Sequence, residues 1–189
     1  MTTGTPTLGL WLKWMVTFLG FPIGGGLAYL LVRSMEGIAK PAIGGFVTGL
    51  VLGVAQWIVL RQVMALSGWW IVATGIGLAA GLALSVAVSG TSIELRPLIV
   101  RAALTGCLLG IAQWLLVRRH VAVAGLWIVV VTVGWALGWT VTRAAGVDLS
   151  RGWLVFGASG ALAFAALTGL ALLYLLRPPS RSKQWAHLV

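Results

Sequence analysis

Charged side chains are scarce in this sequence. Asp, Glu, Lys and Arg together make up 8% of the 189 residues, whereas hydrophobic residues make up 60%. A soluble domain carries roughly 25% charged residues, so this chain has too few of them to cover a surface in water. Their scarcity and a mean hydropathy of +1.03 exclude a soluble globular fold and predict a protein whose solvent is lipid.

Residue types that perform catalysis or bind metals are also few. The chain has one cysteine, Cys107, and two histidines, His120 and His187, which allow no internal disulfide and no metal cluster. No acid lies within an apolar run, so the usual proton relay of a coupled transporter is missing. The sequence also lacks a Gly-Lys-Ser/Thr phosphate motif. We therefore expect no enzyme activity, no catalytic residue, no metal and no cofactor.

Acidic residues are the rarest charged type, with three against thirteen basic residues and a net charge of +10. The basic residues stand singly or in small groups between apolar runs. This placement is typical of juxtamembrane charges, suits anionic lipid headgroups and argues against a nucleic-acid partner. We expect membrane lipids as partners, with anionic headgroups favoured. A second copy of the chain or another protein of a membrane complex are further candidate partners.

Six apolar runs are long enough to cross a hydrocarbon core of roughly 30 Å. They cover about residues 11–33, 42–61, 68–89, 97–117, 121–142 and 152–176. They lack the alternation of barrel strands, and a backbone without water must bond within its own segment. The predicted fold is an all-α integral membrane protein with a single six-helix transmembrane domain, residues 1–177, followed by a basic polar C-terminal tail, residues 178–189.

A duplication organises the chain. Residues 47–61 recur as residues 104–118 without a gap, and residues 68–71 recur at the same offset as residues 125–128. Weaker echoes in the first and last runs, where Leu172 stands in place of a glutamine, extend the pattern to three helical hairpins at about 11–61, 68–117 and 121–176. Repeated units of this kind pack on one another. A pseudo-threefold bundle is the preferred arrangement, and an open row of hairpins is the alternative.

The tandem pattern Ala-Gln-Trp…Leu-Arg…Gly-Trp-Trp, within residues 44–142, resembles small multi-pass bacterial membrane proteins of uncharacterised function. The resemblance implies no activity, ligand or site. We expect a location in the bacterial cytoplasmic (inner) membrane. The side with the termini holds seven basic residues and no acid, whereas the other side holds six basic residues and all three acids. The excess is small, and by the positive-inside rule it places both termini in the cytoplasm.

Small residues recur at every fourth position of the duplicated run, as in Gly45, Gly49 and Gly53. A four-residue spacing keeps them on one helix face. A face of small residues lets another helix backbone approach closely, which is how membrane helices associate. We expect GxxxG packing of helices within the subunit, with a homo-oligomer contact as the alternative.

Polar residues form a second row on the same helices, with Thr48 and Gln56 on one and Thr105 and Gln113 on the other. A glutamine in a spanning helix needs a hydrogen-bond partner. We favour a hydrogen bond between helices, and the alternative is the lining of a pore or cavity.

Aromatic and basic residues are paired at the same end of three runs. The pairs are Trp57 with Arg61, Trp114 with Arg118, and Tyr174 with Arg177. Trp11, Trp14, Trp69, Trp70 and Trp127 fall at the same level. We favour an interfacial aromatic belt with arginines that extend to the membrane surface, and the alternative is a site for anionic lipid headgroups.

These features favour a non-catalytic structural or accessory membrane protein that acts through helix packing and through contacts with lipid or partner proteins. The alternative is a passive channel or small-solute permease lined by the Thr and Gln residues of the second and fourth runs. The two functions differ in where Gln56 and Gln113 point. A channel needs both in a continuous hydrated cavity, whereas a structural bundle bonds both between packed helices.

Overall fold

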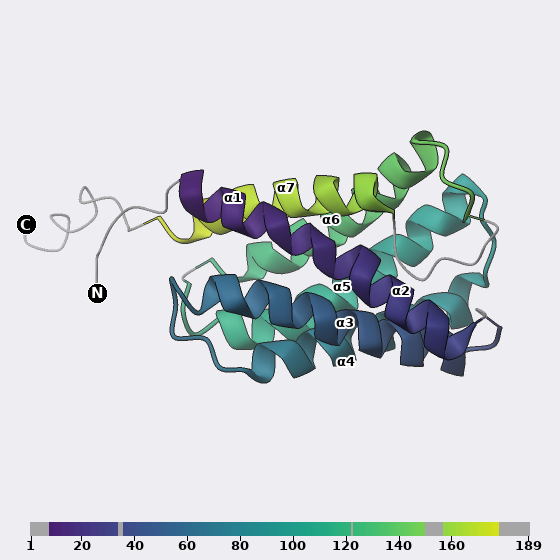
Figure 1. The fold of residues 1–189 in the computed structure, drawn as a ribbon, viewed down its shortest axis with the longest axis horizontal. Helices are drawn as coiled ribbons and strands as arrows, with labels where there is room; N and C mark the ends of the chain where they lie inside the picture. The colour runs from purple at the N-terminus through teal and green to yellow at the C-terminus, as the bar shows by residue number, and fades with distance from the viewer. Residues whose placement is uncertain (1–7, 34–35, 122, 150–156, 178–189) are drawn as a thin grey trace, which may run out of the picture.

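The computed structural model describes residues 8–33, 36–121, 123–149 and 157–177, and helices are the only regular elements in these ranges. They are α1 (Leu8–Val16), the 3-10 helix η1 (Thr17–Leu19), α2 (Gly20–Val32), α3 (Ala39–Leu60), α4 (Trp69–Ser89), α5 (Leu95–Val117), α6 (Gly125–Ala144) and α7 (Ala158–Leu175) (Figure 1). Because α1, η1 and α2 are continuous, the described chain forms six helices that are long and apolar enough to cross a membrane. The prediction of an all-helical chain with six helices of spanning length and hydropathy is confirmed.

The helix ends differ from the expected ones by a few residues. The first span begins at Leu8 and not at residue 11, and α6 begins at Gly125 and not at residue 121. The start expected at residue 152 lies outside the described residues, and α7 begins at Ala158. Hydropathy marks the apolar centre of a span, whereas the hydrogen-bonded helix also includes its polar and small flanking residues.

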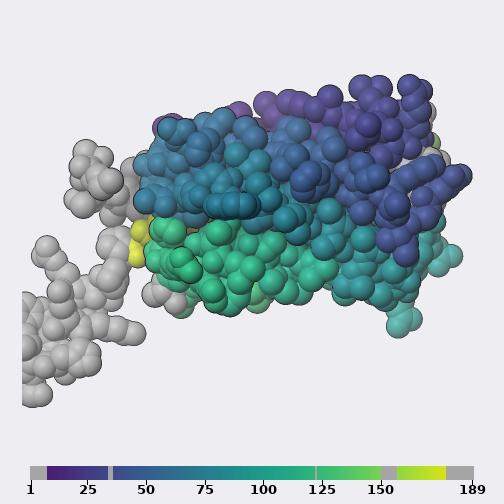
Figure 2. Space-filling view, turned by 90° about the horizontal axis from the view of Figure 1, so that it is seen from below, coloured from purple at the N-terminus to yellow at the C-terminus, as the bar shows by residue number. Residues whose placement is uncertain are grey.

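Each helix packs against the next one along the chain, and α1 packs against α7. The series of contacts therefore returns to its starting point. In Figure 1, α1 lies beside α7, with the start of α1 and the end of α7 at the same end of the bundle, while α2 crosses towards α3. The space-filling view shows the blue, teal and green segments packed along the length of the bundle (Figure 2). Because the helices enclose an interior, a functional site formed by several helices would lie where their inner faces meet.

Glycines set the distance between several helix pairs. A Cβ atom at Gly49 of α3 would lie 2.6 Å from the carbonyl oxygen of Thr74 on α4. A Cβ at Gly81 of α4 would lie 2.8 Å from Cα of Thr105 on α5. Gly26 of α2 has no atom within 4 Å of such a position. The first two glycines thus allow backbones to approach more closely than any side chain would permit.

Large side chains fill the middle of the bundle. Phe21, Trp135 and Phe164 form a cluster from α2, α6 and α7, with ring centroids 5.4 to 5.7 Å apart. All three are at most 2% exposed. Edge-to-face and tilted contacts at this distance are favourable arrangements for aromatic rings. The cluster fills this part of the interior with packed aromatic rings.

Candidate functional site

The two glutamines meet in the interior. Gln113 Nε2 donates a hydrogen bond of 3.1 Å to Gln56 Oε1, and each side chain is 1% exposed. Each glutamine lies one turn before the end of its helix, α3 or α5. Because α3 and α5 run in the same direction on either side of α4, equal positions along them come to equal depth. The duplicated sequence thereby brings its own two copies of one residue together.

Two tryptophans donate hydrogen bonds to the amide oxygens of this glutamine pair. Trp70 Nε1 donates to Gln56 Oε1 at 3.3 Å, and Trp127 Nε1 donates to Gln113 Oε1 at 3.0 Å. Each tryptophan stands near the start of the helix that follows its glutamine, 14 residues further along the chain. A link of that length returns the chain to the same depth. The bonds join α3 to α4 and α5 to α6.

A third indole bond of the same kind joins the two ends of the chain. Trp14 Nε1 donates to Thr168 Oγ1 at 2.9 Å, and this hydroxyl donates to the carbonyl oxygen of Phe164 at 2.7 Å. The bond links α1 to α7. The repeat predicts Leu172 at the position of the glutamines, but the acceptor is Thr168, one helical turn earlier. The chain carries one more helical turn between Thr168 and Arg177 than between either glutamine and its arginine.

A threonine of α4 extends the network. Gln113 Nε2 also donates to Thr74 Oγ1 at 3.1 Å, and Thr74 donates to the carbonyl oxygen of Trp70 at 2.8 Å. We call the whole set the polar layer: Trp14, Gln56, Trp70, Thr74, Gln113, Trp127 and Thr168. It holds no ionisable side chain. Its chemistry is therefore that of neutral hydrogen bonds, which position helices and transfer no protons.

The indole rings of the polar layer lie next to one another. The centroid of Trp127 is 6.1 Å from that of Trp14 and 6.3 Å from that of Trp70, with interplanar angles of 75° and 57°. All three rings are at most 2% exposed. The expected interfacial belt is therefore wrong for these three tryptophans, whereas Trp69, the neighbour of Trp70, is 67% exposed. The sequence carried a signal for this difference, since the duplication keeps Trp70 as Trp127 but replaces Trp69 by Leu126.

The two threonines predicted in the same row lie outside the polar layer, about two helical turns from the glutamines. Thr105 Oγ1 donates to the carbonyl oxygen of Arg101 at 2.9 Å and lies 3.2 Å from Ser85 Oγ. Thr48 is fully buried, and its hydroxyl has no partner among the described residues. The four side chains of the predicted row thus divide into a bonded glutamine pair and two separate threonines.

The three predicted aromatic–basic pairs are all in contact. The guanidinium carbon lies 4.7 Å from the ring centroid in Trp57–Arg61, 5.2 Å in Trp114–Arg118 and 5.8 Å in Tyr174–Arg177. The arginines are exposed, each directly beyond or close to the end of its helix. Trp57 is fixed from its other edge, because its Nε1 donates to the carbonyl oxygen of Leu66 at 3.0 Å. These contacts are cation–π interactions.

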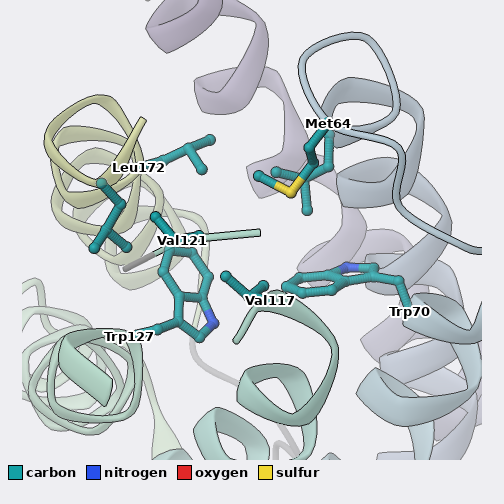
Figure 3. A pocket seen from close by; sticks show the side chains of 8 residues that line it. Met64, Trp70, Val117, Val121, Trp127 and Leu172 are labelled. Carbon is teal, nitrogen blue, oxygen red and sulfur yellow. The ribbon is translucent and has the colours of Figure 1, made fainter. Parts of the chain in front are cut away.

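A small apolar pocket lies between the polar layer and the basic end (Figure 3). Side chains from five helices and two links line it: Leu60, Met64, Trp70, Val117, Val121, Trp127, Leu172 and Leu175. In Figure 3, Val117 lies between the rings of Trp70 and Trp127. Leu172, the residue aligned with the glutamines, thus belongs to the pocket and not to the polar layer.

No protein-family model, curated protein or solved structure matches this chain. The class of protein is therefore defined by the fold and the polar layer alone. That class is a multi-pass helical bundle with six candidate transmembrane helices, in which a layer of neutral hydrogen bonds spans the interior.

Proposed function

We propose that the protein is a non-catalytic polytopic membrane protein with a structural or accessory role, and that its bundle is closed to solutes. The observation that carries the proposal is the hydrogen bond between Gln56 and Gln113, each of which also accepts a bond from an indole. Amides that line a hydrated path bond to water. These amides bond to one another and to tryptophan, which is the arrangement of a packing contact.

The pattern of indole bonds also supports a pseudo-threefold arrangement. Each bond joins one predicted hairpin to another: α3 to α4, α5 to α6, and α7 to α1. The threonine that follows Trp14 by three residues, Thr17, bonds the carbonyl oxygen of Trp14, and Thr74 bonds that of Trp70 in a similar way. Three hairpins around one axis account for this recurrence, and the contact of α1 with α7 favours a closed bundle over an open row.

A passive channel or small-solute permease is the second candidate function, and the interior of the bundle argues against it. A path along the axis would have to cross the polar layer and then the cluster of Phe21, Trp135 and Phe164. Buried rings in contact close such a path, because opening it requires the side chains of several helices to move together. The structural role is therefore the one we adopt.

The outer surface suits contacts with lipid or with a partner protein. Large apolar side chains are exposed on every spanning helix, among them Ile23, Ile58, Ile76, Leu115 and Val129. In a membrane these side chains face acyl chains or another helix. We place the protein in the bacterial cytoplasmic membrane with both termini in the cytoplasm, and a reporter fused to the C-terminus tests that orientation.

Solute flux through proteoliposomes tests the proposed function. Glycerol or sucrose is added outside the vesicles to raise the osmotic pressure. We expect vesicles with the wild-type protein to shrink at the same rate as empty vesicles. Gln56→Leu/Gln113→Leu serves as the comparison. Water or glycerol flux that the wild type increases and this double variant abolishes would contradict the proposal and establish the channel.

A further inference from the structure

Three helices end in the same surface feature, which we call a basic strip. Each strip consists of two exposed apolar or aromatic side chains and an arginine at spacings of four and three residues. The strips are Val54–Ile58–Arg61 on α3, Ile111–Leu115–Arg118 on α5 and Leu170–Tyr174–Arg177 on α7. Residues at these spacings share one helix face. Each strip therefore carries lipid-facing side chains that lead to a guanidinium at the end of the span.

The side chains below the arginines are open to the surroundings of the bundle. Ile58 is 50% exposed, Leu115 is 46% exposed and Tyr174 is 55% exposed. The next residues down the strips, Val54 and Leu170, are 41% and 58% exposed. Each guanidinium thus stands above an apolar surface long enough for the upper part of an acyl chain.

The arginines of the basic strips have no anionic partner in the described part of the chain. All three acids of the chain lie in links at the other end of the bundle: Glu36, Glu94 and Asp148. Two basic residues there are bonded within the protein: Lys40 pairs with Glu36 at 3.5 Å, and Arg101 donates to two carbonyl oxygens of the α4–α5 link.

At the strips, each guanidinium instead lies over an aromatic ring. A cation–π contact needs no hydrogen-bond acceptor, so it leaves the N–H groups of the guanidinium available. Arginine binds phosphate through two parallel N–H groups of such an edge. The contact with the ring also limits the rotamers of the arginine, so less side-chain freedom is lost when an anion binds.

We propose that each basic strip binds one anionic phospholipid, with its phosphate on Arg61, Arg118 or Arg177 and an acyl chain along the apolar side chains below. The proposal rests on the membrane location in the proposed function, but not on the structural role. A lipid, and not free phosphate, is the occupant because the cation and the exposed apolar face are continuous. The three strips at one end predict three lipids in the leaflet on the side of the termini.

Lipid retention by the purified protein, measured by native mass spectrometry, tests the proposal. Detergent-solubilised protein is incubated with an equal mixture of phosphatidylglycerol and phosphatidylcholine. The wild type is expected to keep up to three phosphatidylglycerol molecules in preference to phosphatidylcholine. One arginine at a membrane surface contributes about 1 kcal/mol, so Arg118→Ala should weaken binding at one position about fivefold. Arg61→Ala/Arg118→Ala/Arg177→Ala should remove the preference for phosphatidylglycerol.

Arg119→Ala is the matched control. Arg119 is the neighbour of Arg118 at the same end, is also exposed, and lies outside the strip. The Arg119→Ala variant loses the same charge as Arg118→Ala and should retain as much phosphatidylglycerol as the wild type. Circular dichroism of each variant checks that the helices are intact, and an Arg118→Lys variant of equal charge serves if Arg118→Ala unfolds.

Three outcomes would overturn the proposal. Equal retention by the wild type and the triple variant would remove the arginines from lipid binding. An equal loss in Arg118→Ala and Arg119→Ala would assign the effect to net charge. Displacement of phosphatidylglycerol by glycerol phosphate at similar concentration would assign the site to a free phosphate ester. Flux through the wild-type protein is measured separately, so failure of the proposed function and failure of the lipid sites are distinguishable.

Discussion

Replacing Gln113 by leucine should destabilise the bundle, because this side chain links more helices than any other in the polar layer. The side chain bonds Gln56, Thr74 and Trp127, which belong to three other helices. Its loss leaves the buried N–H of Trp127 without an acceptor, at a cost of about 1–3 kcal/mol. Each lost interhelical bond adds about 0.6 kcal/mol on average in a membrane. We expect Gln113→Leu to lower the free energy of unfolding by about 2–4 kcal/mol.

A double-mutant cycle with Trp127→Phe isolates the bond itself. Each single variant leaves one buried polar atom unpaired, whereas the double variant removes both Trp127 Nε1 and Gln113 Oε1. The double variant should therefore lose about 1–2 kcal/mol less than the sum of the two single variants. Trp69→Phe is the control, because Trp69 is two-thirds exposed and should be additive with Gln113→Leu.

The assay is reversible unfolding in mixed micelles with increasing denaturing detergent, followed by the fluorescence of the remaining tryptophans, of which the wild type has 11. Free energies are compared at one detergent composition. If Gln113→Leu and Trp127→Phe were additive, as the control pair is expected to be, the hydrogen bond would contribute nothing and the polar layer would not hold the helices together.

Two further predictions concern helix contacts and are measured in the same unfolding assay. Gly49→Ala places a Cβ 2.6 Å from a backbone oxygen of α4 and should lower the free energy of unfolding by about 1–3 kcal/mol. Its control, Gly26→Ala, meets no neighbouring helix within 4 Å and should not lower it. Equal effects would show that the bundle does not need the close approach of these backbones. Thr168→Val removes the acceptor of the Trp14 indole, which joins α7 to α1, and should lower the free energy of unfolding by about 1–2 kcal/mol. Its control, Thr140→Val, loses only a bond within its own helix and should lower it by less than about 0.5 kcal/mol. A larger loss in Thr140→Val than in Thr168→Val would exclude closure of the bundle by this bond.

The six helices could be predicted because a span depends on local composition. Length and hydropathy are properties of a continuous segment, and they locate each span to within a few residues. The exact ends depend on caps and links. Gly90, for instance, ends α4 with a positive φ of 64°, a conformation that favours glycine and that hydropathy does not register.

The site was only partly predictable, because its partners are distant in sequence. The need of Gln56 and Gln113 for a hydrogen bond follows from their chemistry, but that each would meet the other depends on how α3 and α5 pack around α4. The bond between Trp14 and Thr168 spans 154 residues. Hydropathy gives an interfacial tryptophan and a buried one the same value, so only packing distinguishes Trp69 from Trp70.

The most direct test of a closed interior is the accessibility of a cysteine placed at Thr48, in a chain where Cys107 is replaced by serine. Thr48 is fully buried among the helices, beyond the polar layer as seen from the termini. We predict that Thr48→Cys in proteoliposomes does not react with a small, charged, water-soluble thiol reagent from either side, while Val63→Cys, exposed in the link that follows α3, reacts rapidly. Reaction at position 48 within tenfold or so of the rate at position 63 would show a hydrated path through the bundle, in contradiction to the proposed closed structure.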